Sequence, residues 1–151
     1  MLASLKALAR PPKVLSELDH GVLACIRAQL RPHQLQRWDD QIAAVCAVQH
    51  MPDGQEVELC RATTGSARRA KCFENRAGEL LLAVVTMQGA DGALNACVWC
   101  VDGELFSIEY DDPALTRQML RGLQEAQRLE WRCELRADLD EPVVQLRGAS
   151  A

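Results

Sequence analysis

The fold is decided by residues 96–110, ACVWCVDGELFSIEY, in which two strand-like runs flank a single Asp-Gly pair. Asp102-Gly103 between alternating apolar runs predicts a β-hairpin, because a two-residue type I′ turn needs positive φ at both central residues. Counting outward from this turn places Trp99 opposite Phe106. A slip of one residue would exchange the two faces of every strand, so the set of predicted core residues depends on this register.

Two further segments extend the hairpin into a meander. Residues 80–87 are a continuous apolar run, residues 89–92 form a turn, and residues 94–101 are the next strand. The same counting predicts one apolar face that packs on helices, formed by Leu82, Val84, Thr86, Cys97, Trp99, Phe106 and Ile108. The opposite face is predicted to carry Leu81, Ala83, Val85, Met87, Ala96, Val98, Cys100, Leu105, Ser107 and Glu109.

Two helices are expected before the meander. Ser16 is an N-cap with acidic residues in the first turn, and apolar residues follow at helical spacing to Leu30. Pro32 begins a second helix whose apolar residues recur at three- and four-residue steps to about Val48. We expect this helical pair to pack on the sheet.

The remaining segments complete an α+β pattern. Residues 57–60 alternate as a short edge strand, and residues 61–78 have no clear period and are expected to form a long loop. Asp112 and Pro113 start a helix that should end near Gln127, residues 129–135 alternate strictly as a strand, and residues 143–146 add a last short strand. The expected fold is a helical pair on a mainly antiparallel sheet of about 4–5 strands, with a further helix before the last long strand.

Length and composition set the class of protein. A chain of 151 residues suits one domain, which buries roughly 70% of its unfolded surface. We expect an N-terminal arm at 1–13, a single α+β domain at 14–147 and a tail at 148–151. A net charge of −4 disfavours nucleic acid and anionic lipid as partners. No run approaches a membrane span, the first ten residues make a poor secretory signal, and the expected location is the cytoplasm.

The seven cysteines are odd in number and scattered among apolar positions, which indicates reduced, mostly buried thiols. Cys97-Val98-Trp99-Cys100 has the spacing of a zinc or redox pair. However, residues three apart in a strand point to opposite faces, whereas zinc needs converging thiolates and the redox motif needs a helix N-terminus. Packed cysteines are the favoured interpretation, with metal and redox roles as alternatives.

No catalytic constellation is evident. The imidazole bases available are His20, His33 and His50, and none lies in a recognisable motif. A phosphate-binding glycine loop, a paired-histidine metal helix and a nucleophile elbow are all absent from the sequence. We therefore expect no catalytic, cofactor-binding or metal-binding residues, and a non-enzymatic role is favoured over an enzymatic one.

Two charged segments are candidates for partner binding. Ser107 and Glu109 lie on the less apolar face of the predicted sheet, and Asp111 and Asp112 extend the acidity beyond it. The long loop concentrates basic residues, among them Arg68 and Arg69. Solvated surfaces are the alternative for both segments, because antiparallel sheets commonly face water on one side.

Part of the sequence resembles a family. The run 101–110, VDGELFSIEY, together with 48–57, VQHMPDGQEV, resembles small uncharacterised bacterial proteins with a helical N-terminal part and a hairpin ending in Phe-Ser-Leu/Ile-Glu-Phe/Tyr. The resemblance covers Leu15 to about Cys133, and its motifs are structural, so it carries over no catalytic residue. Some small bacterial proteins of this build are immunity proteins, which neutralise a toxin by binding it.

Three functions follow as hypotheses. The first is a cytosolic interaction protein, and more specifically an immunity protein that covers a toxin active site with an acidic surface. The second is a small-molecule-binding domain or minor enzyme with a pocket between helices and sheet near Trp38, Trp99 and Tyr110. The third is a homodimer formed through an exposed strand edge, at 56–60 or at 129–136.

Overall fold

The structure is a computed structural model that describes residues 14–51, 55–61 and 66–141. The predicted arm at 1–13, the strand at 143–146 and the tail at 148–151 lie outside these residues. The elements follow in the order α2 (Glu17–Arg27), α3 (Pro32–Ala44), β1 (Val45–His50), β2 (Glu56–Arg61), α4 (Ser66–Ala70), β3 (Leu80–Gly89), β4 (Gly92–Val101), β5 (Glu104–Tyr110), α5 (Pro113–Gln124) and β6 (Glu130–Leu135).

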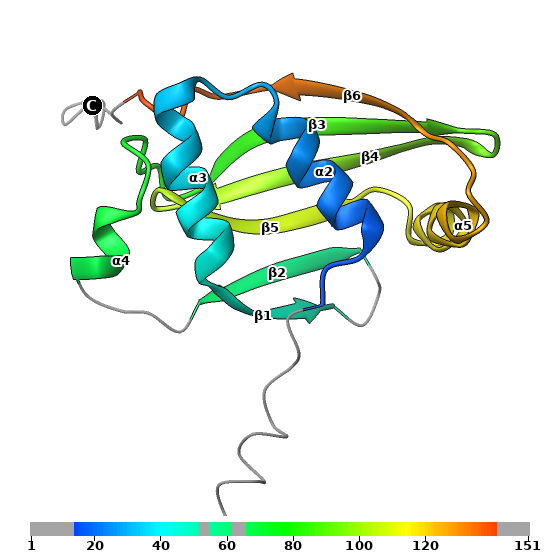
Figure 1. The fold of residues 1–151 in the computed structure, drawn as a ribbon, viewed down its shortest axis with the longest axis horizontal. Helices are drawn as coiled ribbons and strands as arrows, with labels where there is room; N and C mark the ends of the chain where they lie inside the picture. Colours follow the sequence, from blue (N-terminus) through cyan, green and yellow to red (C-terminus); the bar gives the residue numbers. More distant parts are fainter. Residues whose placement is uncertain (1–13, 52–54, 62–65, 142–151) are drawn as a thin grey trace, which may run out of the picture.

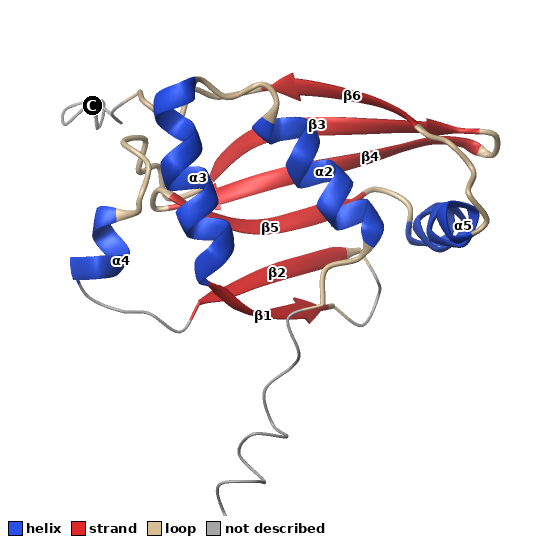
Figure 2. Cartoon of the chain, in the orientation of Figure 1, coloured by secondary structure: helices blue, strands red, loops and turns tan. Residues whose placement is uncertain are grey.

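The described strands form one sheet covered on one face by helices. The strand order is β1-β2-β5-β4-β3-β6, and every neighbouring pair is antiparallel. Figure 1 shows α2 and α3 lying across the sheet, α5 beside the β3–β4 hairpin and α4 at the opposite end. The α+β class, the helical pair and the antiparallel sheet are confirmed, and Figure 2 shows the two layers. The sheet has six strands where about 4–5 were predicted.

The additional strand is β1, whose residues were predicted to continue the second helix. Helix α2 starts as expected at Ser16, which forms a capping box with Asp19, and α3 starts at Pro32. The α3 helix ends at Ala44, and Val45 adopts an extended ψ of 115°. No Gly or Pro marks this boundary, and the apolar residues at 45, 46 and 48 fit the spacing of a helix as well as that of a strand. The residues of β1 contact both α3 and β2, and these tertiary contacts favour the strand over a longer helix.

The position of β2 also differs from the prediction. It pairs with β1 on one side and with β5 on the other, so it is an interior strand and not an edge. Among the described strands, β1 and β6 are the edges. The segment predicted as a long loop contains the short helix α4. Among the described residues, no helix has the length and apolar composition needed to cross a membrane.

The hairpin turn is confirmed, but its register is not. Asp102 and Gly103 have φ values of 52° and 83°, as a type I′ turn requires. Beyond the turn, a β-bulge shifts the pairing, so that Trp99 faces Ser107 and Phe106 is the extra residue. The predicted pairing of Trp99 with Phe106 is therefore wrong.

Most of the predicted faces are exchanged. The side chains of β4 alternate as predicted, but the face that was expected to be open is the one under the helices, and β3 has a second irregularity between Leu81 and Ala83. The residues that are fully buried under the helices are Leu82, Ala83, Val85, Met87, Leu94, Ala96, Val98, Cys100, Leu105, Ile108 and Tyr110. Trp99, Cys97, Phe106 and Val84 lie on the other face. The prediction failed here because β3 and β4 are apolar on both faces, so their sequence carries no signal for which side is buried.

Two buried polar side chains tie the helices to the hairpin. Asp19 on α2 accepts a hydrogen bond of 2.6 Å from the Tyr110 hydroxyl, and both residues are 1% exposed. Burial and the Asp19 carboxylate raise the pKa of Tyr110 well above its usual range. Gln41 on α3 binds the backbone of the turn and of β5. The hairpin is thereby held at both of its ends.

Candidate functional site

The face of the sheet opposite α2, α3 and α5 is left uncovered by those helices (Figure 1). We call it the open face. It carries Leu81, Val84, Thr86 and Gln88 from β3, Ala93, Asn95, Cys97, Trp99 and Val101 from β4, Phe106, Ser107 and Glu109 from β5, and Glu56, Glu58 and Cys60 from β2. Ser107 and Glu109 therefore lie on the face away from the helices, as predicted.

The middle of the open face is apolar. The bulge in β5 turns Phe106 outward, and its side chain is 38% exposed. Trp99, Cys97, Val84 and Leu81 lie in the adjacent strands β4 and β3 and are half-buried. These five residues form the apolar centre. An apolar group of this kind on an uncovered sheet is typical of a surface that contacts another molecule.

An acidic row borders the apolar centre. It consists of Glu56 and Glu58 on β2 and Glu109 on β5, and Glu56 lies directly opposite Glu109 in the ladder. Like charges in this position destabilise a sheet. None of the three carboxylates has a hydrogen-bond or ion-pair partner among the described residues. The open face thus holds negative charge that the described part of the chain does not neutralise.

Asp111 and Asp112, which were predicted with this patch, have structural contacts. Asp111 accepts hydrogen bonds from the Asn95 backbone N–H (3.0 Å) and from the Asn95 side chain (2.9 Å). Asp112 caps α5 by accepting from the Leu115 N–H at 3.0 Å. Charge reversal at these two positions would disturb the fold as well as any partner, so Glu56 and Glu109 are better probes of the open face.

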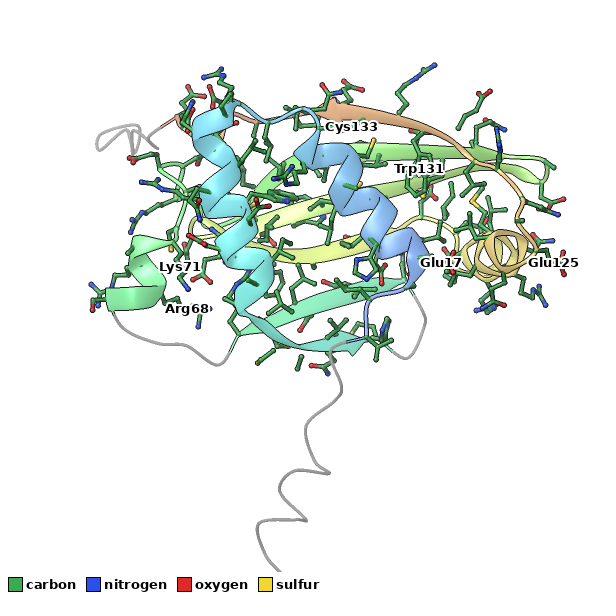
Figure 3. All side chains as sticks on the ribbon, viewed as in Figure 1. Glu17, Arg68, Lys71, Glu125, Trp131 and Cys133 are labelled. Carbon is green, nitrogen blue, oxygen red and sulfur yellow. The ribbon has the colours of Figure 1, made fainter. Side chains whose placement is uncertain are left out.

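Arg68 and Arg69 lie at the other end of β5 from Glu109. Both belong to α4. The Arg68 Nε donates to both carboxylate oxygens of Glu104, at 2.8 and 2.9 Å, while Arg69 is exposed. Figure 3 labels Arg68 beside Lys71 at this end of the molecule. The six predicted partner-binding residues therefore do not form one patch.

A cleft opens between β2 and β5, because the two strands pair only from Glu56 to Glu58 and then separate. Its volume is about 340 Å³. The lining residues include Glu58, Arg61, Arg68, Glu104 and Phe106. This β2–β5 cleft has a volume in the lower range of small-molecule pockets.

Two polar side chains, neither of them among the predicted site residues, replace the missing strand pairing. Arg61, whose side chain is 4% exposed, donates from Nη1 to the Leu105 carbonyl, while its Nε and Nη2 have no hydrogen-bond partner among the described residues. Burial lowers the pKa of the Arg61 guanidinium, and the nearby Glu104 carboxylate opposes this effect. Gln41 accepts from the Leu105 N–H at 2.8 Å. Backbone groups of β5 are thus satisfied where β2 diverges.

Comparisons with protein-family models, with curated proteins and with solved structures find no match. The geometry of this chain is therefore the basis on which its function is inferred.

The histidines do not assemble into a nucleophile–base–orienter arrangement. His33 contacts Asp140 at 2.6 Å on the surface, the His50 ring approaches the Val14 carbonyl at 3.3 Å, and His20 is exposed. Within the described ranges, no group of three His, Cys, Asp or Glu side chains is placed to hold a metal ion.

The cysteines are free thiols, and their environments differ. Cys97 faces outward and Cys100 inward, so the two thiols do not converge, as expected from their spacing in a strand. Burial raises the pKa of Cys100 to about 12. Cys25 on α2 and Cys133 on β6 contact one another, and burial raises the pKa of Cys133 to about 11.

The predicted pocket between helices and sheet is not formed by the three aromatic residues named for it. Trp38 and Tyr110 are packed in the core at 2% and 1% exposure, whereas Trp99 lies on the open face. The candidate site is therefore the open face, with the β2–β5 cleft at one end of it.

Proposed function

We propose that the protein is a non-enzymatic interaction protein that binds a protein partner through the open face. The observation that carries this proposal is the acidic row beside the apolar centre. The fitting partner presents apolar side chains surrounded by lysine or arginine, because these groups complement the surface in both hydrophobicity and charge.

A bound partner accounts for the residues of this face better than solvent alone. Glu56 and Glu109 repel one another across the ladder, and a cation placed between them would convert this repulsion into attraction. Phe106 and Trp99 next to them supply the aromatic contact area that commonly dominates binding energy. Charge and apolar area lie side by side, which is what a specific interface requires.

An immunity protein is the class that fits this proposal best. The resemblance of residues 101–110 points to small bacterial proteins of this build, and an acidic face could cover the basic active site of a toxin. The net charge of −4 agrees with such a partner and opposes nucleic acid or anionic lipid. The corresponding location is the cytoplasm.

The proposal is tested by capture from lysate of the source cells with three baits. The variant E56K/E109K makes two of the three positions of the acidic row basic yet keeps like charges opposite one another, so the stability should stay close to that of the unchanged protein. The control E125K/E141K makes the same change in net charge at two exposed residues away from the open face.

We expect the unchanged protein and E125K/E141K to retain the same partner and E56K/E109K to lose it, mainly through a slower association rate. Equal capture by all three baits, or no specific capture by any of them, would contradict the proposal.

A small-molecule-binding function is the second candidate, and the β2–β5 cleft supports it. Arg61 lines this cleft, and its buried Nε and Nη2 have no hydrogen-bond partner among the described residues, so the expected ligand is a small carboxylate. Thermal-shift measurements separate the candidates, because a ligand that binds only the native state raises the unfolding midpoint. If this candidate is correct, a carboxylate raises the unfolding midpoint of the unchanged protein but not that of R61M. The interaction proposal predicts that the carboxylate changes neither midpoint.

A further inference from the structure

Strand β6 forms one edge of the sheet, and its outer backbone groups face away from the described part of the chain. Arg136 donates its N–H to the Leu82 carbonyl of β3 at 2.8 Å. In an antiparallel ladder, residues that bond to one neighbouring strand alternate with residues that face the other side. By this alternation from Arg136, the N–H and C=O groups of Trp131, Cys133 and Leu135 point outward, away from β3. Figure 1 shows β6 along this edge.

We propose that β6 pairs antiparallel with β6 of a second copy of this chain, with Cys133 at the two-fold axis. The sequence Glu130-Trp131-Arg132-Cys133-Glu134-Leu135-Arg136 is self-complementary in this register. Arg132 lies opposite Glu134 of the second copy, and Glu130 lies opposite Arg136 of the second copy. Every charged residue thus meets the opposite charge, which stabilises a cross-strand pair.

The neighbouring registers are unfavourable. Moving the axis by one residue, to Arg132 or to Glu134, places Arg opposite Arg or Glu opposite Glu at the axis and repeats like-charge pairs on either side. Moving it by two residues restores opposite charges but leaves fewer strand residues paired. Charge therefore excludes the registers one residue away, and the register centred on Cys133 is favoured over those two residues away because it pairs the whole of β6.

Apolar residues support the same register on the helix side of the sheet. Trp131 lies opposite Leu135 of the second copy, and Leu135 is 38% exposed in the single chain. The Trp131 indole packs on α2 at Gly21, where a Cβ atom would come within 2.3 Å of it. Figure 3 shows Trp131 and Cys133 alongside α2. The dimer would cover Leu135 with an indole that α2 already holds in place.

The charge pattern distinguishes β6 from the other edge. Strand β1 (Val45–His50) has no acidic residue and no Lys or Arg, so it has no charged side chains that could favour a particular pairing register. Single-sign charges on an edge prevent pairing, whereas alternating opposite signs allow it with an identical strand. The proposed contact joins the two sheets edge to edge and leaves both open faces accessible, so it does not depend on the proposed function.

Charge-swap variants of the full chain test the dimer by sedimentation velocity over a concentration series. E130R/E134R makes all four charged positions basic, and R132E/R136E makes all four acidic. The control E130R/R132E/E134R/R136E carries all four changes but restores opposite charges in every pair. Circular dichroism checks that each variant is folded.

We expect the unchanged protein and the fourfold control to dimerise, and each uniform variant to have a dimer dissociation constant raised about a hundredfold. An equimolar mixture of the two uniform variants should associate again. A monomeric unchanged protein, dimers unaffected by the uniform variants, or a mixture that stays monomeric would overturn the proposal.

Discussion

Replacing Gln41 with alanine is expected to lower the free energy of unfolding by about 3 to 4 kcal/mol. Gln41 is 1% exposed and makes three hydrogen bonds. Its Nε2 donates to the carbonyls of Lys71 (2.7 Å) and Gly103 (3.0 Å), and its Oε1 accepts from the Leu105 N–H (2.8 Å). Removing the side chain leaves the Leu105 N–H buried without a partner, because β2 has already separated from β5 there.

Urea unfolding measures this loss, and Gln36→Ala is the matched control. Gln36 lies on the same helix, is exposed and bonds only to the neighbouring Asp40 side chain among the described residues. We expect the control to change stability by less than about 0.5 kcal/mol. Similar losses for the two variants would show that Gln41 does not hold the hairpin as described.

The second large effect is expected at Tyr110. Tyr110→Phe should lower the free energy of unfolding by about 2 to 3 kcal/mol, because the Asp19 carboxylate loses a charge-assisted hydrogen bond while remaining buried. The ring itself is preserved, so the loss reports the hydroxyl and not the packing.

A double-mutant cycle with Asp19→Asn tests this explanation. An amide at position 19 keeps a side-chain oxygen that can accept from the Ser16 N–H, but it removes the buried charge. Tyr110→Phe should therefore cost clearly less in the Asp19→Asn background than in the unchanged protein, as expected for two groups in direct contact. Equal costs in both backgrounds would mean that the two side chains are not coupled.

Local signals in the sequence predicted the elements well. Asp102-Gly103 specified the hairpin, Ser16 and Asp112 specified helix starts, and the strict alternation at 130–135 specified β6. Each of these features acts over a few residues, so no knowledge of tertiary contacts is needed. The exception is β1. No Gly or Pro separates it from α3, so the change from helix to strand depends on tertiary packing.

The faces of the sheet could not be predicted in the same way. Strands β3 and β4 are apolar on both sides, so a single bulge at Phe106 was enough to place Trp99 in the predicted core. Ser107 and Glu109 lie on the face away from the helices because the bulge at Phe106 changes the alternation of β5, so that Ser107 shares a face with Trp99. Gln41 was missed because a polar residue in an amphipathic helix predicts exposure. Arg61 was assigned to the basic long loop, because its buried role arises only where β2 and β5 separate.

The tryptophans allow the most direct test of the claim that the open face binds a partner. Trp99 lies on the open face, Trp38 lies in the core and Trp131 lies on the edge strand, so their indole N–H resonances report three separate regions. Titration with the captured partner, followed by NMR, is expected to shift the Trp99 resonance and to leave that of Trp38 unchanged. A complex that forms without moving the Trp99 resonance would contradict the account.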